Sequence, residues 1–163
     1  MTLLAGVFSR SKQSPVPASI CDSIHEYISR NSVDEVRVFE DSRCCLAKVD
    51  IGAFGESAFI VDDDRNVSML AGEPLLARGE DDNDWQSRTR DLEVLHESWL
   101  RGDWNSLTRA RGVFCGLHYQ SATGTLSLIA DKLAIRPLFY SVDDQYVVFA
   151  SALRILESLA QIP

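Results

Sequence analysis

The chain has 163 residues, of which 45% are hydrophobic, and a formal net charge of −8. This length suits one globular domain, and an acidic surface repels nucleic acid and anionic membranes, so neither is expected as a partner. No apolar run approaches the roughly 18 residues of a membrane span, and the N-terminus lacks a signal-peptide pattern, which predicts a cytoplasmic protein.

Apolar periodicity predicts the elements of an α+β domain. In chain order, the first half is predicted to contain strand Leu3–Phe8, a helix from Pro17 or Ser19 to Asn31, and strands Val36–Phe39, Cys44–Ile51, Ser57–Val61 and Val67–Leu70. A loop is predicted at Gly52–Gly55. A second, polar loop is predicted at Arg78–Arg88, because its acidic run lacks the spaced glycine and the terminal carboxylate of a calcium loop.

The second half is predicted to start with a helix that Thr89 or Asp91 caps and Gly102 ends, followed by a short helical turn around Trp104 and Leu107. Four strands follow at Val113–Tyr119, Thr125–Ala130, Pro137–Val142 and Tyr146–Ala150, and Ser151 caps a last helix at Ala152–Ala160. The strands do not alternate with helices, which indicates antiparallel sheets in an α+β domain.

The cysteines and histidines show no metal or catalytic spacing. Cys21, Cys44, Cys45 and Cys115 form no CxxC pair and have no histidine at metal-ligand intervals, so the sequence predicts buried free thiols and no metal site. His25, His96 and His118 have no serine, cysteine or aspartate partner at motif spacing. They are interpreted as structural or surface residues, although catalytic triads assemble in space rather than along the chain.

Motifs at both ends of the chain resemble one family. Met1–Phe8 is an apolar run containing Gly6, and Asp131–Tyr140 is followed by Phe149–Leu153. The first resembles the opening strand of class II glutamine amidotransferase domains. The second pair resembles the asparagine synthetase motifs Asp-x-Leu-Gly-Ile-x-Pro-Leu-Tyr-Tyr and Phe-Ala-Ser-Glu-Leu. The resemblance implies one type-2 glutamine amidotransferase-like domain over 1–163, with the four-layer αββα sandwich of two antiparallel sheets found in N-terminal nucleophile hydrolases.

This resemblance assigns Thr2 to the nucleophile position, where the family has cysteine. Thr with a free N-terminal amine is a competent nucleophile and base pair, and removal of Met1 would expose it. The alternative interpretation is a β-branched residue that simply begins a strand.

Two further family motifs fall on altered residues. Ala71-Gly72-Glu73 aligns with the family's Asn-Gly-Glu, so Gly72 and Glu73 match as substrate-binding positions while the asparagine oxyanion donor is missing. Loss of one such donor costs about 100- to 1000-fold in turnover. The family arginine that binds the substrate carboxylate falls on Cys45, whose thiol cannot make the bidentate contact of an arginine.

Asp91 lies in a stretch that resembles the family's Asp-x-Glu-Val, in which the aspartate helps to bind the substrate amine. Capping of the helix that begins there is the alternative role. The family's ATP-pyrophosphatase half, with its Ser-Gly-Gly-x-Asp-Ser loop, has no counterpart in this sequence. The chain is therefore expected to hold no cofactor, and ATP and Mg²⁺ are expected only in a synthetase partner domain or chain.

The altered positions favour a degenerate domain without glutaminase activity that docks on the synthetase part of an ATP-dependent amide ligase. Such domains occur in asparagine-synthetase-like enzymes outside asparagine biosynthesis, including β-lactam synthetases and lasso-peptide cyclases. Two alternatives stay open. One is an active Thr2-nucleophile glutaminase, and the other is a regulatory module that binds glutamine or a related amino acid at Glu73 and Asp91. The sequence leaves a homo-oligomer open as well.

Overall fold

The computed structural model describes residues 2–31, 33–51, 57–76 and 88–159. The chain divides into two compact units, one formed by Met1–Ala53 with Pro137–Pro163 and the other by Phe54–Arg136. The loop predicted at 52–55, nearly all of the polar loop at 78–88, and the predicted helix end at residue 160 lie outside the described residues.

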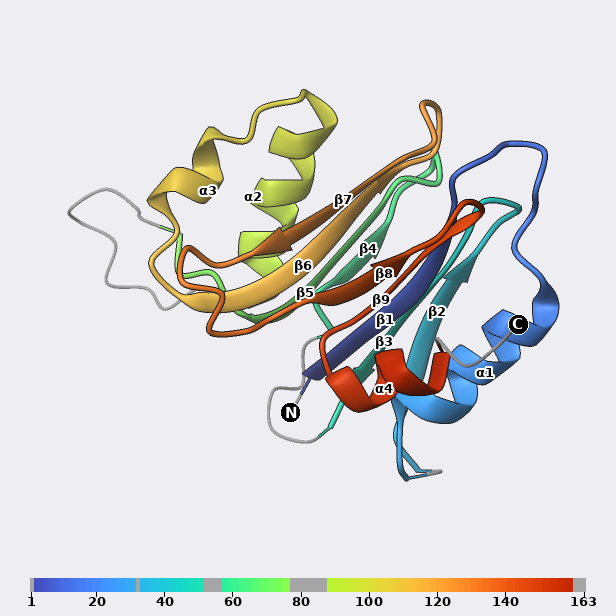
Figure 1. Ribbon diagram of the computed structural model, residues 1–163. Coiled ribbons are helices and arrows are strands. Elements are labelled where there is room, and N and C mark those ends of the chain that lie inside the picture. Colours follow the sequence, from blue (N-terminus) through green and yellow to red (C-terminus); the bar gives the residue numbers. More distant parts are fainter. Residues whose placement is uncertain (1, 32, 52–56, 77–87, 160–163) are drawn as a thin grey trace. The chain divides into compact units, whose positions relative to one another are not determined.

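The first unit contains a five-stranded antiparallel sheet in the order β2-β3-β1-β9-β8 (Figure 1). Its strands are β1 (Thr2–Ser9), β2 (Val36–Glu40), β3 (Cys44–Asp50), β8 (Phe139–Val142) and β9 (Tyr146–Ala150). Two helices, α1 (Ala18–Ile28) and α4 (Leu153–Leu159), complete the unit. The two ends of the chain therefore form one sheet, in which β1 pairs with β9.

Alternation along β1 and β3 determines which side chains face the helices. Leu3, Ala5 and Val7 of β1 share a core with alternate residues of β3 and with apolar side chains of α1 and α4. The remaining members of that core are Cys45, Ala47, Val49, Ile20, Ile24, Ile28, Ala150, Ile155, Leu156 and Leu159. Residues of β1 and β3 with the opposite parity, including Thr2 and Lys48, project from the other face of the sheet.

The second unit contains a four-stranded antiparallel sheet in the order β4-β5-β6-β7. Its elements are β4 (Phe59–Val61), β5 (Val67–Glu73), α2 (Arg88–Leu100), α3 (Asn105–Arg109), β6 (Val113–Gln120) and β7 (Thr125–Ala130) (Figure 1). Leu92, Leu95 and Trp99 of α2 pack on Leu70 and Phe114 of the sheet. Each unit thus consists of a helical layer and a sheet layer. An αββα sandwich is built from two such pairs of layers.

The predicted α+β class with two antiparallel sheets is confirmed, but some bounds differ. β4 begins at Phe59 rather than Ser57, β5 continues to Glu73 rather than ending at Leu70, and β8 begins at Phe139 rather than Pro137. α1 ends at Ile28 rather than Asn31, and Ser29 has extended backbone angles. α2 already begins at Arg88, so Thr89 and Asp91 lie within its first turn. The Ser151 hydroxyl accepts a 2.9 Å hydrogen bond from Leu4 N, which ties the start of α4 to β1.

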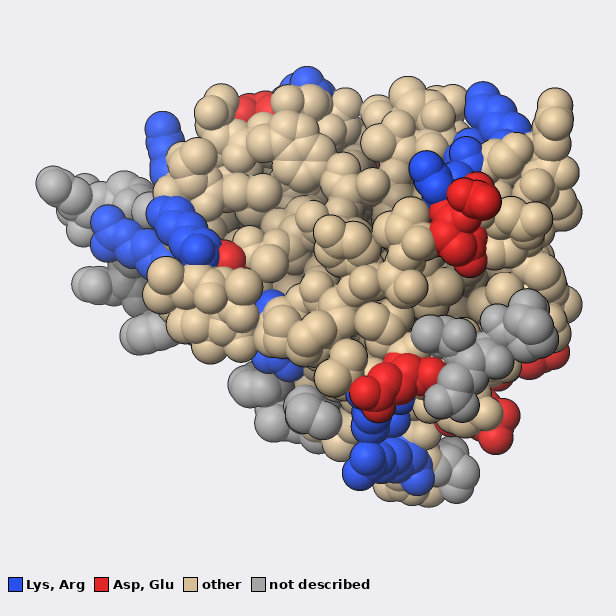
Figure 2. Space-filling model, viewed as in Figure 1, with Lys and Arg blue, Asp and Glu red and all other residues tan. Residues whose placement is uncertain are grey.

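Charge is dispersed on the face drawn in Figure 2, where the Lys and Arg side chains and the Asp and Glu side chains of the described residues form small separate groups. The acidic side chains of the described residues therefore form no single patch on this face. Within the four described ranges, no helix is both long and apolar enough to span a lipid bilayer.

Candidate functional site

Thr2 begins β1 and lies opposite Asp50 of β3 in the antiparallel register. Its Oγ1 donates a 2.6 Å hydrogen bond to Asp50 Oδ1, and the residue is buried. The position that the sequence assigns to a nucleophile therefore holds a hydroxyl directed at a carboxylate.

Lys48 extends this arrangement, because its ammonium group forms a salt bridge with Asp50 Oδ2. Lys48 is fully buried, whereas the Asp50 side chain is 28% exposed. A buried ammonium group requires a counter-charge, and Asp50 supplies it. We refer to Thr2, Asp50 and Lys48 as the Thr2 cluster. Sequence analysis missed Asp50 and Lys48, although two charged residues at a spacing of two in an otherwise apolar strand are a detectable signal.

Gly72 lies near the end of β5 with a φ of +93°, in the region that favours glycine. A methyl group at this position would collide with the Val113 carbonyl oxygen and lie 3.0 Å from Phe114 Cα. The backbone conformation and the close neighbouring backbone thus explain why glycine occupies this position. Glu73 follows at the strand end, paired with Val113 and partly exposed, whereas the preceding Ala71 is fully buried opposite Cys115.

Asp91 is buried in the first turn of α2, and its Oδ2 accepts a 3.4 Å hydrogen bond from Leu76 N. Leu76 is three residues beyond Glu73. The structure thus links Asp91 to the segment that follows Gly72 and Glu73, all within the unit Phe54–Arg136, while Thr2 belongs to the other unit.

Cys45, at the position where the family has a substrate-binding arginine, belongs to the core beneath α1 and α4. It therefore projects from the face opposite to the Thr2 cluster. Burial raises the pKa of the Cys45 thiol above its ordinary range, and burial likewise raises the pKa of Cys115 to about 12. All four cysteines are free thiols; Cys44, Cys45 and Cys115 are buried as predicted, whereas Cys21 is only half-buried.

A buried polar network on the α2 side of the second unit was not apparent from the sequence. Ser68 Oγ lies 2.8 Å from His96 Nδ1 and 2.9 Å from His118 Nδ1. A hydroxyl can donate to one ring nitrogen and accept from another, so the two histidines take different tautomers. His96 Nε2 is 3.4 Å from Asp62 Oδ2. Ser68 and both histidines are buried, so this serine, histidine and aspartate arrangement lies largely inside the unit.

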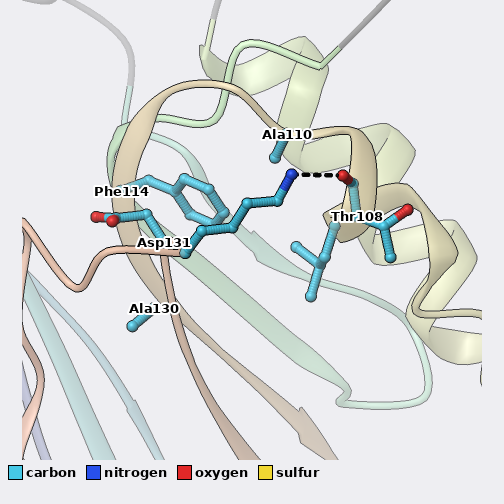
Figure 3. A pocket seen from close by; sticks show the side chains of 7 residues that line it. Thr108, Ala110, Phe114, Ala130 and Asp131 are labelled. Atoms are coloured by element: carbon cyan, nitrogen blue, oxygen red, sulfur yellow. Dashed lines mark hydrogen bonds between the residues drawn. The ribbon is translucent and has the colours of Figure 1, made fainter.

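Figure 3 shows a pocket of about 420 Å³ between the short helix that carries Thr108 and the strand end that carries Ala130 and Asp131. Lys132 Nζ donates a 2.7 Å hydrogen bond to the Thr108 carbonyl oxygen across it. None of its described lining residues is a predicted substrate-binding or catalytic residue, although Asp131 and Lys132 open the family-like motif Asp131–Tyr140.

Comparison with known proteins gives one family. The model of a glutamine amidotransferase domain matches residues 74–158, just over half of the chain. The matched stretch includes Asp91 and the motif Asp131–Tyr140, and it begins one residue after Glu73. No curated protein matches the chain.

Proposed function

The chain belongs to the glutamine amidotransferase domain family, and from this premise we propose that it is a degenerate class II domain of an asparagine-synthetase-like amide ligase. It would dock on the ATP-pyrophosphatase synthetase part, carried by another domain or chain in the cytoplasm, without hydrolysing glutamine. ATP and Mg²⁺ would bind only to that partner.

The observation that carries this proposal is the burial of Ala71 at the position of the family's oxyanion donor. Ala71 lies in β5 opposite Cys115, is fully buried, and has no side-chain donor. An oxyanion that forms on a γ-amide would lack that hydrogen bond, at a cost of about 100- to 1000-fold in turnover. Cys45, in the core on the helix side of its sheet, supplies no substitute for the arginine that binds the substrate carboxylate.

A docking role is supported by the loop that follows β7. Asp131 Oδ1 accepts hydrogen bonds from Leu133 N at 3.0 Å and Ile135 N at 3.1 Å, and Oδ2 accepts one from Arg136 N at 3.1 Å. The carboxylate thus holds a loop on which Leu133 is 79% exposed and Ile135 is 61% exposed. Two fixed apolar side chains in water are suited to the apolar centre of a protein interface.

Measurement of ammonia release from glutamine tests whether hydrolysis is absent. The protein with its native N-terminus is compared with a Thr2→Ala variant. The proposal expects no release above background from either protein, with N-terminal processing established by mass spectrometry. Release that disappears in Thr2→Ala would overturn it.

The docking role is tested separately, by co-elution with an asparagine-synthetase-like synthetase chain from the same organism. Leu133→Asp combined with Ile135→Asp is expected to abolish co-elution, because an interface cannot bury two unpaired carboxylates. Val94→Asp is the matched control, since Val94 is 42% exposed on α2 of the same unit. Co-elution that survives the double substitution would exclude this loop as the docking surface.

One observation favours a second candidate, a glutaminase with Thr2 as nucleophile. The Thr2 hydroxyl already donates to Asp50, which is held by Lys48. After removal of Met1, the Thr2 oxygen would attack the γ-amide carbonyl, and the α-amine would pass the hydroxyl proton to the departing ammonia. Water would then hydrolyse the acyl-enzyme to glutamate. A retained Met1 excludes this mechanism, because the α-amine of Thr2 would be part of a peptide bond.

A further inference from the structure

Three side chains with metal-binding atoms converge in the first unit, away from the Thr2 cluster. They are Cys21 of α1, Glu40 at the end of β2, and Cys45 of β3, and their ligand atoms all lie within 4.8 Å of one another. Cys45 Sγ is 3.8 Å from Glu40 Oε1.

The fold explains this convergence. Glu40 and Cys45 are direct partners in the antiparallel register of β2 and β3. Cys45 belongs to the core covered by α1, and Cys21 packs against the same core from the helix. Two neighbouring strands and the helix above them thus each contribute one donor.

His25 adds a fourth group. It lies one helical turn after Cys21 on the same side of α1, and its Nε2 is 3.3 Å from Glu40 Oε1. A carboxylate ligand of a metal is commonly oriented by such an outer hydrogen bond. The side chains of His25 and Glu40 are 47% and 51% exposed, so an ion can reach the buried sulfur of Cys45 from this edge.

We propose that Cys21, Glu40 and Cys45 bind a zinc ion, with His25 orienting the Glu40 carboxylate. Two thiolates exclude Mg²⁺ and Ca²⁺, which take oxygen ligands, and they favour Zn²⁺. With Zn–S near 2.3 Å and Zn–O near 2.1 Å, sulfur and oxygen are about 3.6 Å apart in a tetrahedral site. The observed 3.8 Å between Cys45 and Glu40 requires only a small adjustment. The fourth position is open to water.

Zinc binding at this site cross-links α1 to the sheet edge at β2 and β3. Binding displaces the thiol protons of Cys21 and Cys45 to solvent. The site lies on the helix side of the sheet, opposite to the Thr2 cluster, so the inference does not depend on whether the domain hydrolyses glutamine.

Cobalt titration of the metal-free full chain tests the proposal, because Co²⁺ replaces Zn²⁺ and thiolate ligation gives an intense near-ultraviolet charge-transfer band. One equivalent of Co²⁺ is expected to saturate the band, and Zn²⁺ is expected to bleach it. Cys21→Ser and Glu40→Gln should each weaken Co²⁺ binding at least tenfold, while Cys115→Ser in the other unit should leave it unchanged.

Zinc should also raise the Tm of the natural chain and of Cys115→Ser, but not that of Cys21→Ser. Cys21 is only half-buried, so circular dichroism can establish that its variant folds. Absence of the charge-transfer band in the natural chain overturns the proposal. A band of equal strength in the folded Cys21→Ser variant does so as well.

Discussion

Ser68 Oγ lies 2.9 Å from His118 Nδ1, and these two residues are direct cross-strand partners in β5 and β6. His118 is 3% exposed, and its ring meets His96 edge-on at a centroid distance of 5.8 Å. Burial, and then the neighbouring His96, lower the pKa of His118 to about 4, although Asp62 and the Val67 backbone act in the opposite direction. At neutral pH this histidine is therefore uncharged.

The first prediction is an acid-dependent loss of stability through His118. In the unfolded chain His118 binds a proton near pH 6.5, whereas in the folded chain it stays neutral until about pH 4. Between these values the unfolded state binds more protons, so the free energy of unfolding falls as the pH is lowered, by up to roughly 3 kcal/mol. Urea unfolding at several pH values between 7 and 4.5 measures this slope.

His118→Gln should show a shallower decline over the same pH range, whatever its stability at pH 7. Equal slopes for His118→Gln and the natural chain would contradict the assignment.

The second prediction concerns Gly6, which lies opposite Phe149 in the pairing of β1 with β9. A methyl group at Gly6 would be 2.5 Å from Phe149 Cζ and 2.8 Å from the Cys45 carbonyl oxygen. Gly6→Ala should therefore cost about 1–3 kcal/mol of unfolding free energy, as overpacking does in a dense core.

A Phe149→Leu background tests the origin of that cost. Leucine is shorter and frees the space at Cζ, so Gly6→Ala should be less harmful there than in the natural chain. Denaturant unfolding of the four proteins in this cycle gives the coupling energy. If the effects of Gly6→Ala and Phe149→Leu on the free energy of unfolding are strictly additive, the Phe149 ring is not the obstacle.

The strands could be predicted from the sequence because segments such as Thr125–Ala130 and Tyr146–Ala150 are short, mainly apolar runs that follow turn residues. Helix ends were less accurate. Asn31 and Thr89 are good terminal residues by local propensity, but α1 ends at Ile28, where Ser29 is already extended, and α2 begins at Arg88. Terminal propensities are weak signals, so they locate a helix end only to within a few residues.

In the candidate site, too, local features could be predicted and long-range contacts could not. Gly72 could be identified from the Ala71-Gly72-Glu73 motif, because its positive φ is a requirement of one residue and favours glycine there. The partners of Thr2 and His118 could not, because Asp50 and Ser68 reach them through sheet register over separations of 48 and 50 residues. No spacing rule along the chain encodes such a register.

The third prediction is that Asp131 rigidifies the loop with the exposed Leu133 and Ile135. Burial raises the pKa of Asp131, but hydrogen bonds from the amides of Arg136, Ile135 and Leu133 outweigh this and leave the pKa below its usual range. Asp131→Ala should increase hydrogen exchange of these three amides about tenfold or more. Asp143→Ala, which removes the acceptor for Gln145 N and Tyr146 N, should leave them protected.

The fourth prediction is that Asp50→Ala is strongly destabilising, because it removes the salt-bridge partner of the fully buried Lys48. Deleting one partner of a buried ion pair is strongly destabilising and should cost roughly 3 kcal/mol. Adding Lys48→Met should recover much of that loss, since methionine fills the space without a charge. Glu93→Gln is the contrast, because the Arg90–Glu93 pair is exposed and should change the unfolding free energy little. If Lys48→Met restores nothing, the cost of Asp50→Ala arises from packing around Thr2 rather than from the lost salt bridge with Lys48.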